Sequence, residues 1–366
     1  MKIVCNKALL TDALNGVSKA VTMRSSIPVL EGILLKAEGF AITLTGYDLE
    51  MGITTTIEAN VREPGEVVLS AKLFGDMIKR LASEEVEINC NETNATSIKG
   101  GITEFNIMGM NPGDYPSLPT PGADETLMMD ADDLREIIDT TIFAVSQDNQ
   151  KPAHTGELFV IEKDKLTVVA LDGYRLAIME KNIEATKDIN IIIPAKTLLE
   201  LSKLLCETDQ KVKISANRRF VVFTAGEYTI ISRLIEGDFL DYKRVIPEGY
   251  KTKVTIDVRD FQNSIERASL IITERLKNPL RILFDENVTV RCQTTLGKVI
   301  DELDAKIEGE SVEIGFNNRY LLDALRNSGC DKVVMEISGP LSPVKMMPAD
   351  SNAFLFLVLP VRFKND

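Results

Sequence analysis

Val169-Ala170-Leu171-Asp172-Gly173-Tyr174-Arg175-Leu176 predicts a β-strand that ends in a tight turn and returns as a second strand. The apolar residues before Asp172 are typical of a buried strand, and Asp-Gly is a strong turn signal. An earlier stretch, Leu44-Thr45-Gly46-Tyr47-Asp48-Leu49-Glu50, has the same pattern. The two aspartates are 124 residues apart (172 − 48 = 124). This spacing indicates a repeated unit of domain size.

Three more pairs of landmarks have the same spacing. They are Gly32 and Gly156, Ala71-Lys72 and Ala195-Lys196, and Gly113-Asp114-Tyr115 and Gly237-Asp238-Phe239. A chain of 366 residues has room for three such units, each large enough to bury its own core. We therefore predict three domains, at residues 1–122, 123–249 and 250–366.

The composition is that of an ordinary globular protein, with 44% hydrophobic and 27% charged residues. The longest apolar run, Ala353 to Leu359, is too short to span a bilayer. The first residues also lack the apolar core of a signal peptide. We therefore expect a cytoplasmic protein.

Hydrophobic periodicity predicts two helices in each repeated unit. The predicted helices are Lys7 to Val21, Ala71 to Leu81, Ala131 to Val145, Ala195 to Cys206, Val258 to Ile271 and Arg319 to Asn327. Alternating segments between them predict antiparallel strands, including Val29-Leu30 and one strand from Val299 to Ile307. The predicted fold class is α+β, with three similar domains in tandem that each pack two helices on antiparallel sheet.

Residues suited to catalysis or metal binding are scarce. The five cysteines are scattered without a Cys-x-x-Cys spacing, so we expect them to be reduced. The single histidine, His154, excludes a two-histidine metal site or acid/base pair. Gly297-Lys298 is followed by Val299 and does not form a phosphate-binding loop. We predict no catalytic residue, metal or cofactor, and a buried carboxylate pair would be the best support for an enzyme.

Basic residues recur seven positions apart on the second helix of each unit. The pairs are Lys72 and Lys79, Lys196 and Lys203, and Arg319 and Arg326. Each pair lies along one helix face about 10 Å apart, which suits a polyanion that is contacted without sequence preference. The alternative is that these are ordinary solvated helix faces. The net charge of −13 argues against bulk attraction to DNA, unless the basic side chains are gathered on helices that face a hole.

Five segments resemble the family of bacterial sliding clamps, the beta subunit of DNA polymerase III. They are Ile27-Pro28-Val29-Leu30, Leu44 to Met51, Leu171 to Leu176, Asp241 to Pro247 and Leu359 to Arg362. The resemblance covers the whole chain and implies a head-to-tail dimer that closes a ring around duplex DNA. It also implies a non-enzymatic processivity factor that tethers DNA polymerases and repair proteins and that a separate ATP-driven clamp loader opens and closes.

The resemblance implies sites for DNA and for ring closure. The implied DNA-contacting residues are Arg24, Lys72, Lys79, Arg135, Gln147, Lys196, Lys203 and Arg244. At ring closure, an edge strand at Phe105 and Ile107 would meet Leu270 and Ile271 of the other protomer. Such pairing would cover an exposed strand edge.

The resemblance also implies a site between the second and third domains for a short linear peptide with apolar anchors. The implied residues are Leu171, Gly173, Tyr174, Arg175, Leu176, Leu240, Val245, Leu357 and Leu359, with Asn317, Tyr320, Pro360, Val361 and Arg362 beside them. Taken without the resemblance, these leucines are interpreted as ordinary core.

Two positions depart from the family pattern. Leu240 stands where a proline is common, and Lys151-Pro152-Ala153-His154 replaces a more apolar run at the edge of the peptide site. We interpret His154 as a rim or packing residue rather than a pH switch. The rival interpretation of the whole chain is a monomeric, repeat-built interaction scaffold that never encloses DNA, and its main support is the negative charge.

Overall fold

The computed structural model describes residues 1–120, 126–185, 188–206, 211–272 and 279–362. It divides into two compact units, Met1–Asp132 with Glu200–Leu234, and Asp133–Leu199 with Ile235–Asp366. The predicted domain boundary between residues 122 and 123 lies outside the described residues. All five cysteines are free.

Each repeat has the order strand, helix, strands, helix, three strands. The first contains β1 (Lys2–Asn6), α1 (Lys7–Val17), β2 (Gly32–Glu38), β3 (Ala41–Tyr47), β4 (Met51–Glu63), β5 (Gly65–Ser70), α2 (Ala71–Arg80), β6 (Glu85–Cys90), β7 (Ala95–Gly100) and β8 (Thr103–Met108). The second contains β9 (Thr126–Asp130), α3 (Ala131–Thr141), β10 (Gly156–Glu162), β11 (Lys165–Leu171), β12 (Arg175–Asn182), β13 (Ile189–Pro194), α4 (Ala195–Leu205), β14 (Lys211–Ala216), β15 (Phe220–Ala225) and β16 (Tyr228–Arg233).

The third repeat follows the same order with one additional short strand. It contains β17 (Thr252–Asp257), α5 (Val258–Ser269), β18 (Leu280–Phe284), β19 (Val288–Thr294), β20 (Gly297–Leu303), β21 (Lys306–Gly309), β22 (Val312–Phe316), α6 (Asn318–Arg326), β23 (Lys332–Ile337), β24 (Val344–Pro348) and β25 (Phe354–Val358). The predicted α+β class and its threefold repetition are confirmed. The prediction missed the short strands β1, β9 and β17, which precede the first helix of each repeat.

Two strand predictions were wrong. Val29 and Leu30 lie in the 3-10 turn Pro28–Glu31, where Pro28 occupies the first turn of the helix and both apolar side chains are buried. The strand expected from Val299 to Ile307 is two strands. β20 pairs with β19, whereas β21 pairs with β17, so the break between them lets the chain pass from one sheet to another.

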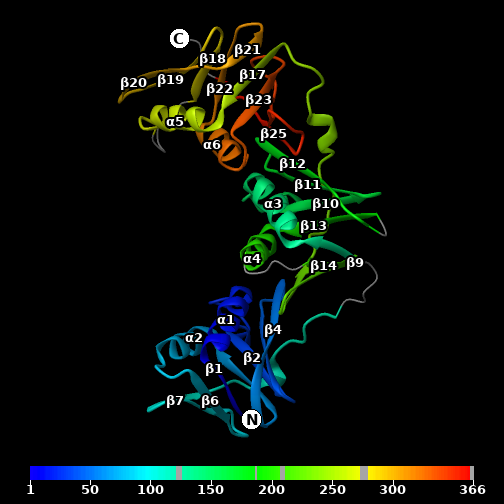
Figure 1. Cartoon of the computed structure of the whole chain (residues 1–366), viewed down its shortest axis with the longest axis vertical. Coiled ribbons are helices and arrows are strands. Elements are labelled where there is room, and N and C mark those ends of the chain that lie inside the picture. Colours follow the sequence, from blue (N-terminus) through cyan, green and yellow to red (C-terminus); the bar gives the residue numbers. More distant parts are fainter. Residues whose placement is uncertain (121–125, 186–187, 207–210, 273–278, 363–366) are drawn as a thin grey trace. The chain divides into compact units, whose positions relative to one another are not determined.

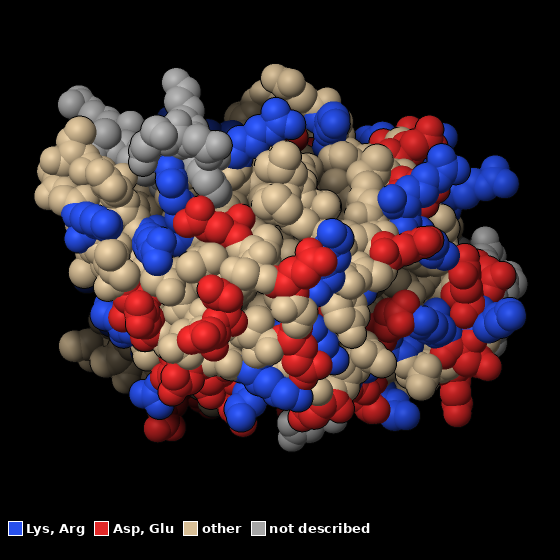
Figure 2. Space-filling view, turned by 90° about the horizontal axis from the view of Figure 1, so that it is seen from above, with Lys and Arg blue, Asp and Glu red and all other residues tan. Residues whose placement is uncertain are grey.

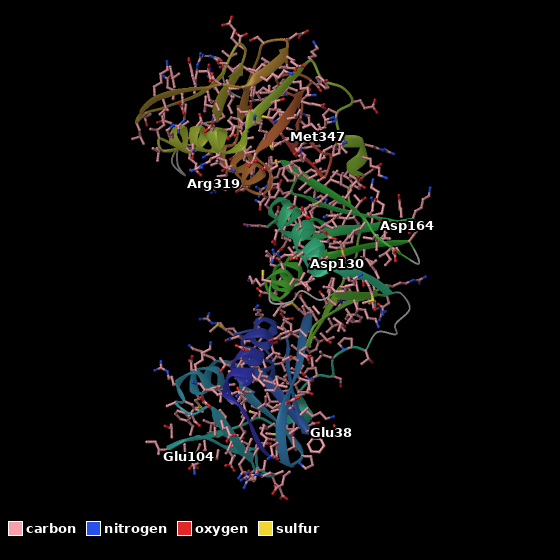
Figure 3. The ribbon with its side chains drawn as sticks, viewed as in Figure 1. Glu38, Glu104, Asp130, Asp164, Arg319 and Met347 are labelled. Carbon is pink, nitrogen blue, oxygen red and sulfur yellow. The ribbon has the colours of Figure 1, made fainter. Side chains whose placement is uncertain are left out.

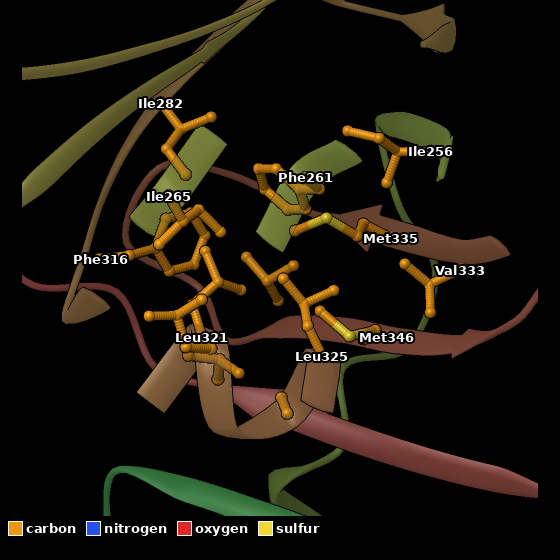
Figure 4. Close-up of a cluster of buried hydrophobic side chains, with 14 of the residues drawn as sticks. Ile256, Phe261, Ile265, Ile282, Phe316, Leu321, Leu325, Val333, Met335 and Met346 are labelled. Carbon is orange, nitrogen blue, oxygen red and sulfur yellow. The ribbon is translucent and has the colours of Figure 1, made fainter. Parts of the chain in front are cut away.

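The helices pack because their apolar residues share one face. In the third repeat, Phe261 and Ile265 of α5 and Leu321 and Leu325 of α6 meet the strands around Met335 (Figure 4). All five side chains are at most 1% exposed. Helices α1 and α2 lie side by side in one compact unit, and α5 and α6 do so in the other (Figure 1). No described helix is long and apolar enough to span a membrane.

Strand pairing joins consecutive repeats within each compact unit. At the first junction, β4 pairs with β16 from Met51↔Ser232 to Thr55↔Tyr228. At the second junction, β12 pairs with β25 from Arg175↔Val358 to Met179↔Phe354. In both, the third of the central strands of one repeat pairs antiparallel with the last strand of the next. The resulting sheets have the orders β8-β7-β6-β1-β4-β16-β15-β14-β9 and β13-β10-β11-β12-β25-β24-β23-β17-β21, and β20-β19-β18-β22 form a separate sheet.

Candidate functional site

The turn between β11 and β12 is held by its own aspartate. Asp172 Oδ1 accepts the backbone N–H of Tyr174 at 2.8 Å and that of Arg175 at 3.0 Å. Gly173 has a φ of +90°, which favours glycine over other residues. Just beyond β25, the backbone N–H of Leu359 donates to the carbonyl oxygen of Tyr174 at 2.9 Å. Tyr174 itself is 60% exposed.

Arg175 connects this turn to helix α6. Its Nε donates to Asp172 Oδ2 at 3.0 Å, and its Nη1 donates to Asp323. The guanidinium also lies over two rings, with its central carbon 4.8 Å from the centroid of Tyr320 and 5.4 Å from that of Phe143. The Arg175 side chain is only 12% exposed, so it positions the surface rather than projecting from it.

Phe143 and Asp323 were not predicted as site residues. Asp323 lies one helical turn after Tyr320, so their shared helix face was a signal available in the sequence. Nothing local marks Phe143. The rings of Tyr174 and Tyr320 stack with centroids 5.7 Å apart, which completes an aromatic surface between the turn and α6.

The predicted peptide-site leucines separate into a buried floor and a partly exposed rim. Leu171, Leu176 and Leu357 are at most 3% exposed and belong to a cluster that Phe239 and Tyr242 partly cover. These three leucines are therefore buried, as the interpretation of them as core predicts. The rim residues with exposed apolar surface are Tyr174, Leu240, Val245 and Val361, with Leu359 and Pro360 partly exposed.

The remaining predicted peptide-site residues lie beside the rim. Asn317 caps α6, and its Oδ1 accepts the backbone N–H of Arg319 at 3.0 Å. The backbone N–H of Val361 donates to the carbonyl oxygen of Gly315 at 2.8 Å, which fixes the segment after β25. Arg362 is exposed. All the predicted peptide-site residues lie within one compact unit.

His154 lies beside Phe239, which packs against the buried leucine cluster. Its ring meets that of Phe239 edge-on, with centroids 5.6 Å apart. Partial burial and the nearby charge of Lys151 lower the pKa of His154, and Asp172 partly opposes this shift. The imidazole is therefore neutral at physiological pH, in keeping with a packing role.

The predicted DNA-contacting residues are mostly exposed. Lys72 and Lys79 lie on α2, and Lys196 and Lys203 lie on α4. Arg24, Gln147 and Arg244 lie in exposed segments outside the α-helices, and Arg135 is partly buried on α3. Arg319 lies at the start of α6 (Figure 3).

Several of these cations have acidic neighbours. Lys203 pairs with Glu200 at 2.8 Å, Arg244 with Asp241 at 2.8 Å, and Arg326 with Glu266 at 2.7 Å. Acidic and basic side chains are also intermixed over the face shown in Figure 2. The compact unit that contains the N-terminus holds Arg24, Lys72, Lys79 and Lys203, and the other holds Arg135, Gln147, Lys196 and Arg244.

The residues predicted for ring closure lie at two sheet edges. Phe105 and Ile107 share one side of the edge strand β8, with the exposed residues Glu104 and Asn106 on the other. Figure 3 marks Glu104 on this strand. Leu270 follows α5 and is 83% exposed, whereas Ile271 packs against the core of the third repeat. Helix α5 packs on the edge strand β20, where Arg267 Nη2 pairs with Asp301 at 2.5 Å.

One buried carboxyl group stands out in the second repeat. Glu157 is fully buried, and its Oε1 lies 2.8 Å from Thr141 Oγ. Burial is the main cause that raises the pKa of Glu157 well above its usual range. The charge of Asp139 also raises the pKa of Glu157. Asp139 is exposed, however, so the two residues do not form a buried carboxylate pair. Among the described residues, no group of three or more His, Cys, Asp or Glu side chains could hold a metal ion.

Three repeats joined by strand pairing, with an apolar surface at the second junction, define a tandem array of the clamp class. The DNA polymerase III beta subunit profiles match along its length, with the N-terminal domain at residues 1–119, the central domain at 128–241 and the C-terminal domain at 243–362. The chain belongs to the DNA polymerase III beta subunit family.

Relatives and solved structures agree with this assignment. The chain is 35% identical over 361 residues to the beta sliding clamp of Staphylococcus aureus, covering 95% of this chain and 96% of the relative. A DNA polymerase sliding clamp structure from Bacillus subtilis is 30% identical, with a TM-score of 0.97 and full coverage of both chains. The putative DNA polymerase III beta subunit of Eubacterium rectale is 33% identical, with a TM-score of 0.95 and 99% coverage of both chains.

Proposed function

We propose that this chain is a processivity factor that closes with a second copy into a ring around duplex DNA. It tethers DNA polymerases and repair proteins through the apolar surface at the second junction. A separate loader opens and closes the ring, and the chain itself catalyses no reaction. A monomeric scaffold is not favoured, because the named relatives are sliding clamps. We retain residues 1–122, 123–249 and 250–366 as the proposed domains and the cytoplasm as the proposed location.

The observation that carries ring formation is the repeated strand pairing. The third central strand of the first repeat pairs with the last strand of the second, and the second repeat pairs with the third in the same way. The third repeat has the equivalent central strand, β20, at an edge of its sheet, and the first repeat has its last strand, β8, at an edge. Applying the same pairing a third time joins β20 of one chain to β8 of another.

The side chains at these two edges support such pairing. Met108 on β8 is 71% exposed, and Ile300 on β20 is 52% exposed. Leu270 and Leu296 add exposed apolar surface near β20. An exposed apolar edge strand invites association with another strand, and two such pairings in a head-to-tail dimer would remove both edges from each chain.

Sequence-independent contact with DNA is proposed for the exposed basic residues. Few basic residues are proposed to contact DNA, and acidic neighbours partly neutralise some of these residues, as Glu200 does beside Lys203. Each phosphate contact is therefore weak, and weak non-specific contacts permit movement along the duplex. Retention then comes from the closed ring rather than from affinity, which reconciles DNA contact with a net charge of −13.

The peptide-binding proposal rests on the floor and rim of the second junction. The buried leucines form an apolar base, and the exposed side chains Leu240 and Val245 are next in sequence to Phe239 and Ile246, which pack against it. Partner peptides with leucine or phenylalanine anchors would bury this surface, while their backbone hydrogen bonds fix orientation.

Retention on DNA of different topology tests the proposal. The chain is loaded by its matching loader onto nicked circular DNA, and half of the sample is then linearised with a restriction enzyme. We expect retention on the circle and release from the linear DNA, because a ring can slide off a free end. Equal loss from both forms would reject topological tethering. Solution mass is a second measurement, and a ring of two chains has about twice the 40.5 kDa of one chain.

A further inference from the structure

Tyr174 lies two positions beyond the buried leucines of the second junction. Leu176 pairs with Leu357 in the ladder between β12 and β25, and these residues are 3% and 1% exposed. Two residues away on each chain segment, the backbone N–H of Leu359 donates to the carbonyl oxygen of Tyr174 at 2.9 Å. Two residues of extended chain span about 7 Å. A peptide residue next to an anchor on this floor is therefore within reach of Tyr174.

The ring of Tyr174 is already held by its neighbours. It stacks on the ring of Tyr320, with an angle of 20° between the two planes. Tyr320 also contacts the guanidinium of Arg175, which is bonded to both Asp172 and Asp323. These contacts order the Tyr174 ring, yet 60% of the residue remains exposed. A ligand that binds the exposed part therefore pays little for ordering this side chain.

An exposed and ordered ring favours a second aromatic ring over other apolar groups. Aromatic pairs associate about twofold to tenfold more tightly than their buried area alone would give. A leucine buries apolar surface but lacks this additional attraction. The charged groups beside the rings offer less to a ligand, because Asp172 and Asp323 already pair with Arg175. The chemistry that Tyr174 presents is therefore aromatic rather than ionic.

We infer that Tyr174 makes the second junction selective for partner peptides that carry an aromatic residue next to an apolar anchor. The anchor packs on the floor, and the aromatic residue packs on the exposed part of the Tyr174 ring. Tyr320 and Arg175 are positioning residues, since they act through Tyr174. This inference rests on the proposed peptide-binding function of the second junction.

A purely structural role for the two tyrosines is the alternative. In that case, the stack of Tyr174 on Tyr320 only joins the turn before β12 to α6. Its loss would then change stability without changing which peptides bind. A ring that only stabilises the fold does not distinguish an aromatic residue from a leucine in the ligand, so peptide selectivity separates the two roles.

Matched peptides and the full-length chain test the inference. The parent probe is a synthetic peptide that copies the C-terminal tail of a replicative DNA polymerase. Each residue next to its apolar anchors is replaced in turn by tyrosine or by leucine, and isothermal titration calorimetry gives the dissociation constants. At one of these positions, the tyrosine peptide should bind about twofold to tenfold more tightly than the leucine peptide. Tyr174→Leu should abolish this preference, whereas Tyr174→Phe should keep it.

Controls separate selectivity from general disturbance. Urea unfolding checks that each variant keeps its fold, and Phe40→Leu, at the separate hairpin between β2 and β3, should keep the preference for tyrosine. Tyrosine and leucine peptides that bind equally at every position would overturn the inference, as would a preference that survives Tyr174→Leu. In both cases the peptides still bind, so the proposed function stands. Failure of every peptide to bind the unaltered chain would overturn the proposed peptide binding as well.

Discussion

The guanidinium of Arg175 lies across the ring of Tyr320, with its central carbon 4.8 Å from the ring centroid. This contact joins β12 of the second repeat to α6 of the third, beside the strand pairing of β12 with β25. Asp323 neutralises the same guanidinium from the same helix. The second junction is therefore held by a charged and aromatic contact as well as by backbone hydrogen bonds.

Replacing this arginine with lysine should weaken the junction. Arg175→Lys keeps the charge but loses the planar fork and the stacking on Tyr320, so the free energy of unfolding should fall by about 1–2 kcal/mol. Urea unfolding measures the change. Arg362→Lys, at an exposed position, is the matched control and should be nearly neutral. Equal effects of the two substitutions would contradict a specific role for the Arg175 contacts.

The sequence was sufficient to predict features that depend on local chemistry. The turns at Asp48 and Asp172 were predictable because each aspartate caps its own turn, and their spacing revealed the repeat. The starts of α2 and α4, at Ala71 and Ala195, followed from helical periodicity. Val29 was misassigned because an apolar residue in a 3-10 turn has the same composition as one in a strand.

Contacts between distant segments could not be predicted in this way. Phe143, Arg175 and Tyr320 come from three separate segments, and no local pattern relates them. The separation of the leucines into floor and rim also depends on tertiary packing. Leu176 and Leu359 are the same residue type, each in an apolar segment, but Leu176 is buried whereas Leu359 is partly exposed.

Charged substitutions at these two leucines should therefore have different effects. Leu359→Asp places a charge at a partly exposed rim, so polymerase stimulation should be lost while the dimer and the fold persist. Leu176→Asp places a charge in a cluster where the side chain is 3% exposed, which should cost about 3 kcal/mol or more of folding free energy. Primer extension measures polymerase stimulation, solution mass reports the dimer, and urea unfolding gives the stability of each variant. Loss of the dimer in Leu359→Asp would mean that this residue belongs to the core.

A charge on β8 should prevent ring closure. Ile107→Asp introduces a carboxylate at the proposed pairing edge, where desolvation on association would be unfavourable. The mass in solution should fall from about twice 40.5 kDa toward that of one chain. Phe40→Asp is a suitable control, because Phe40 is 89% exposed at the separate hairpin between β2 and β3. A dimer that survives Ile107→Asp unchanged would exclude this edge.

Neutralising the basic residues of α2 should alter salt dependence more than polymerase recruitment. Lys72→Ala with Lys79→Ala removes two proposed phosphate contacts, so the logarithmic dependence of DNA binding on salt should lose about one unit of slope for each lysine. Binding of a synthetic peptide that copies the C-terminal tail of a replicative DNA polymerase should not change. Lys163→Ala, in the exposed hairpin between β10 and β11, provides the control. An unchanged salt slope would remove α2 from the DNA contact surface.

The buried carboxyl of Glu157 should make stability depend on pH. Thr141 Oγ lies 2.8 Å from both the carbonyl oxygen of Ile137 and Glu157 Oε1. The hydroxyl has one proton to donate to Ile137, so a protonated Glu157 that donates to Thr141 satisfies both contacts. Burial accordingly raises the pKa of Glu157 well above 4.5 in the folded chain. The folded state then binds more protons than the unfolded state, and the free energy of unfolding should fall as pH rises above about 4.5.

Glutamine at this position removes that titration while keeping a similar shape. Glu157→Gln should raise the free energy of unfolding near pH 8 by about 1–3 kcal/mol and flatten its pH profile, since no buried proton is left to lose. Urea unfolding from pH 5 to pH 8 measures both effects. Glu162→Gln, at the exposed end of the same strand, should leave the profile unchanged. If the free energy of unfolding varies with pH in the same way for Glu157→Gln and the unaltered chain, ionisation of Glu157 does not destabilise the fold. That result would contradict a protonated Glu157 that donates to Thr141.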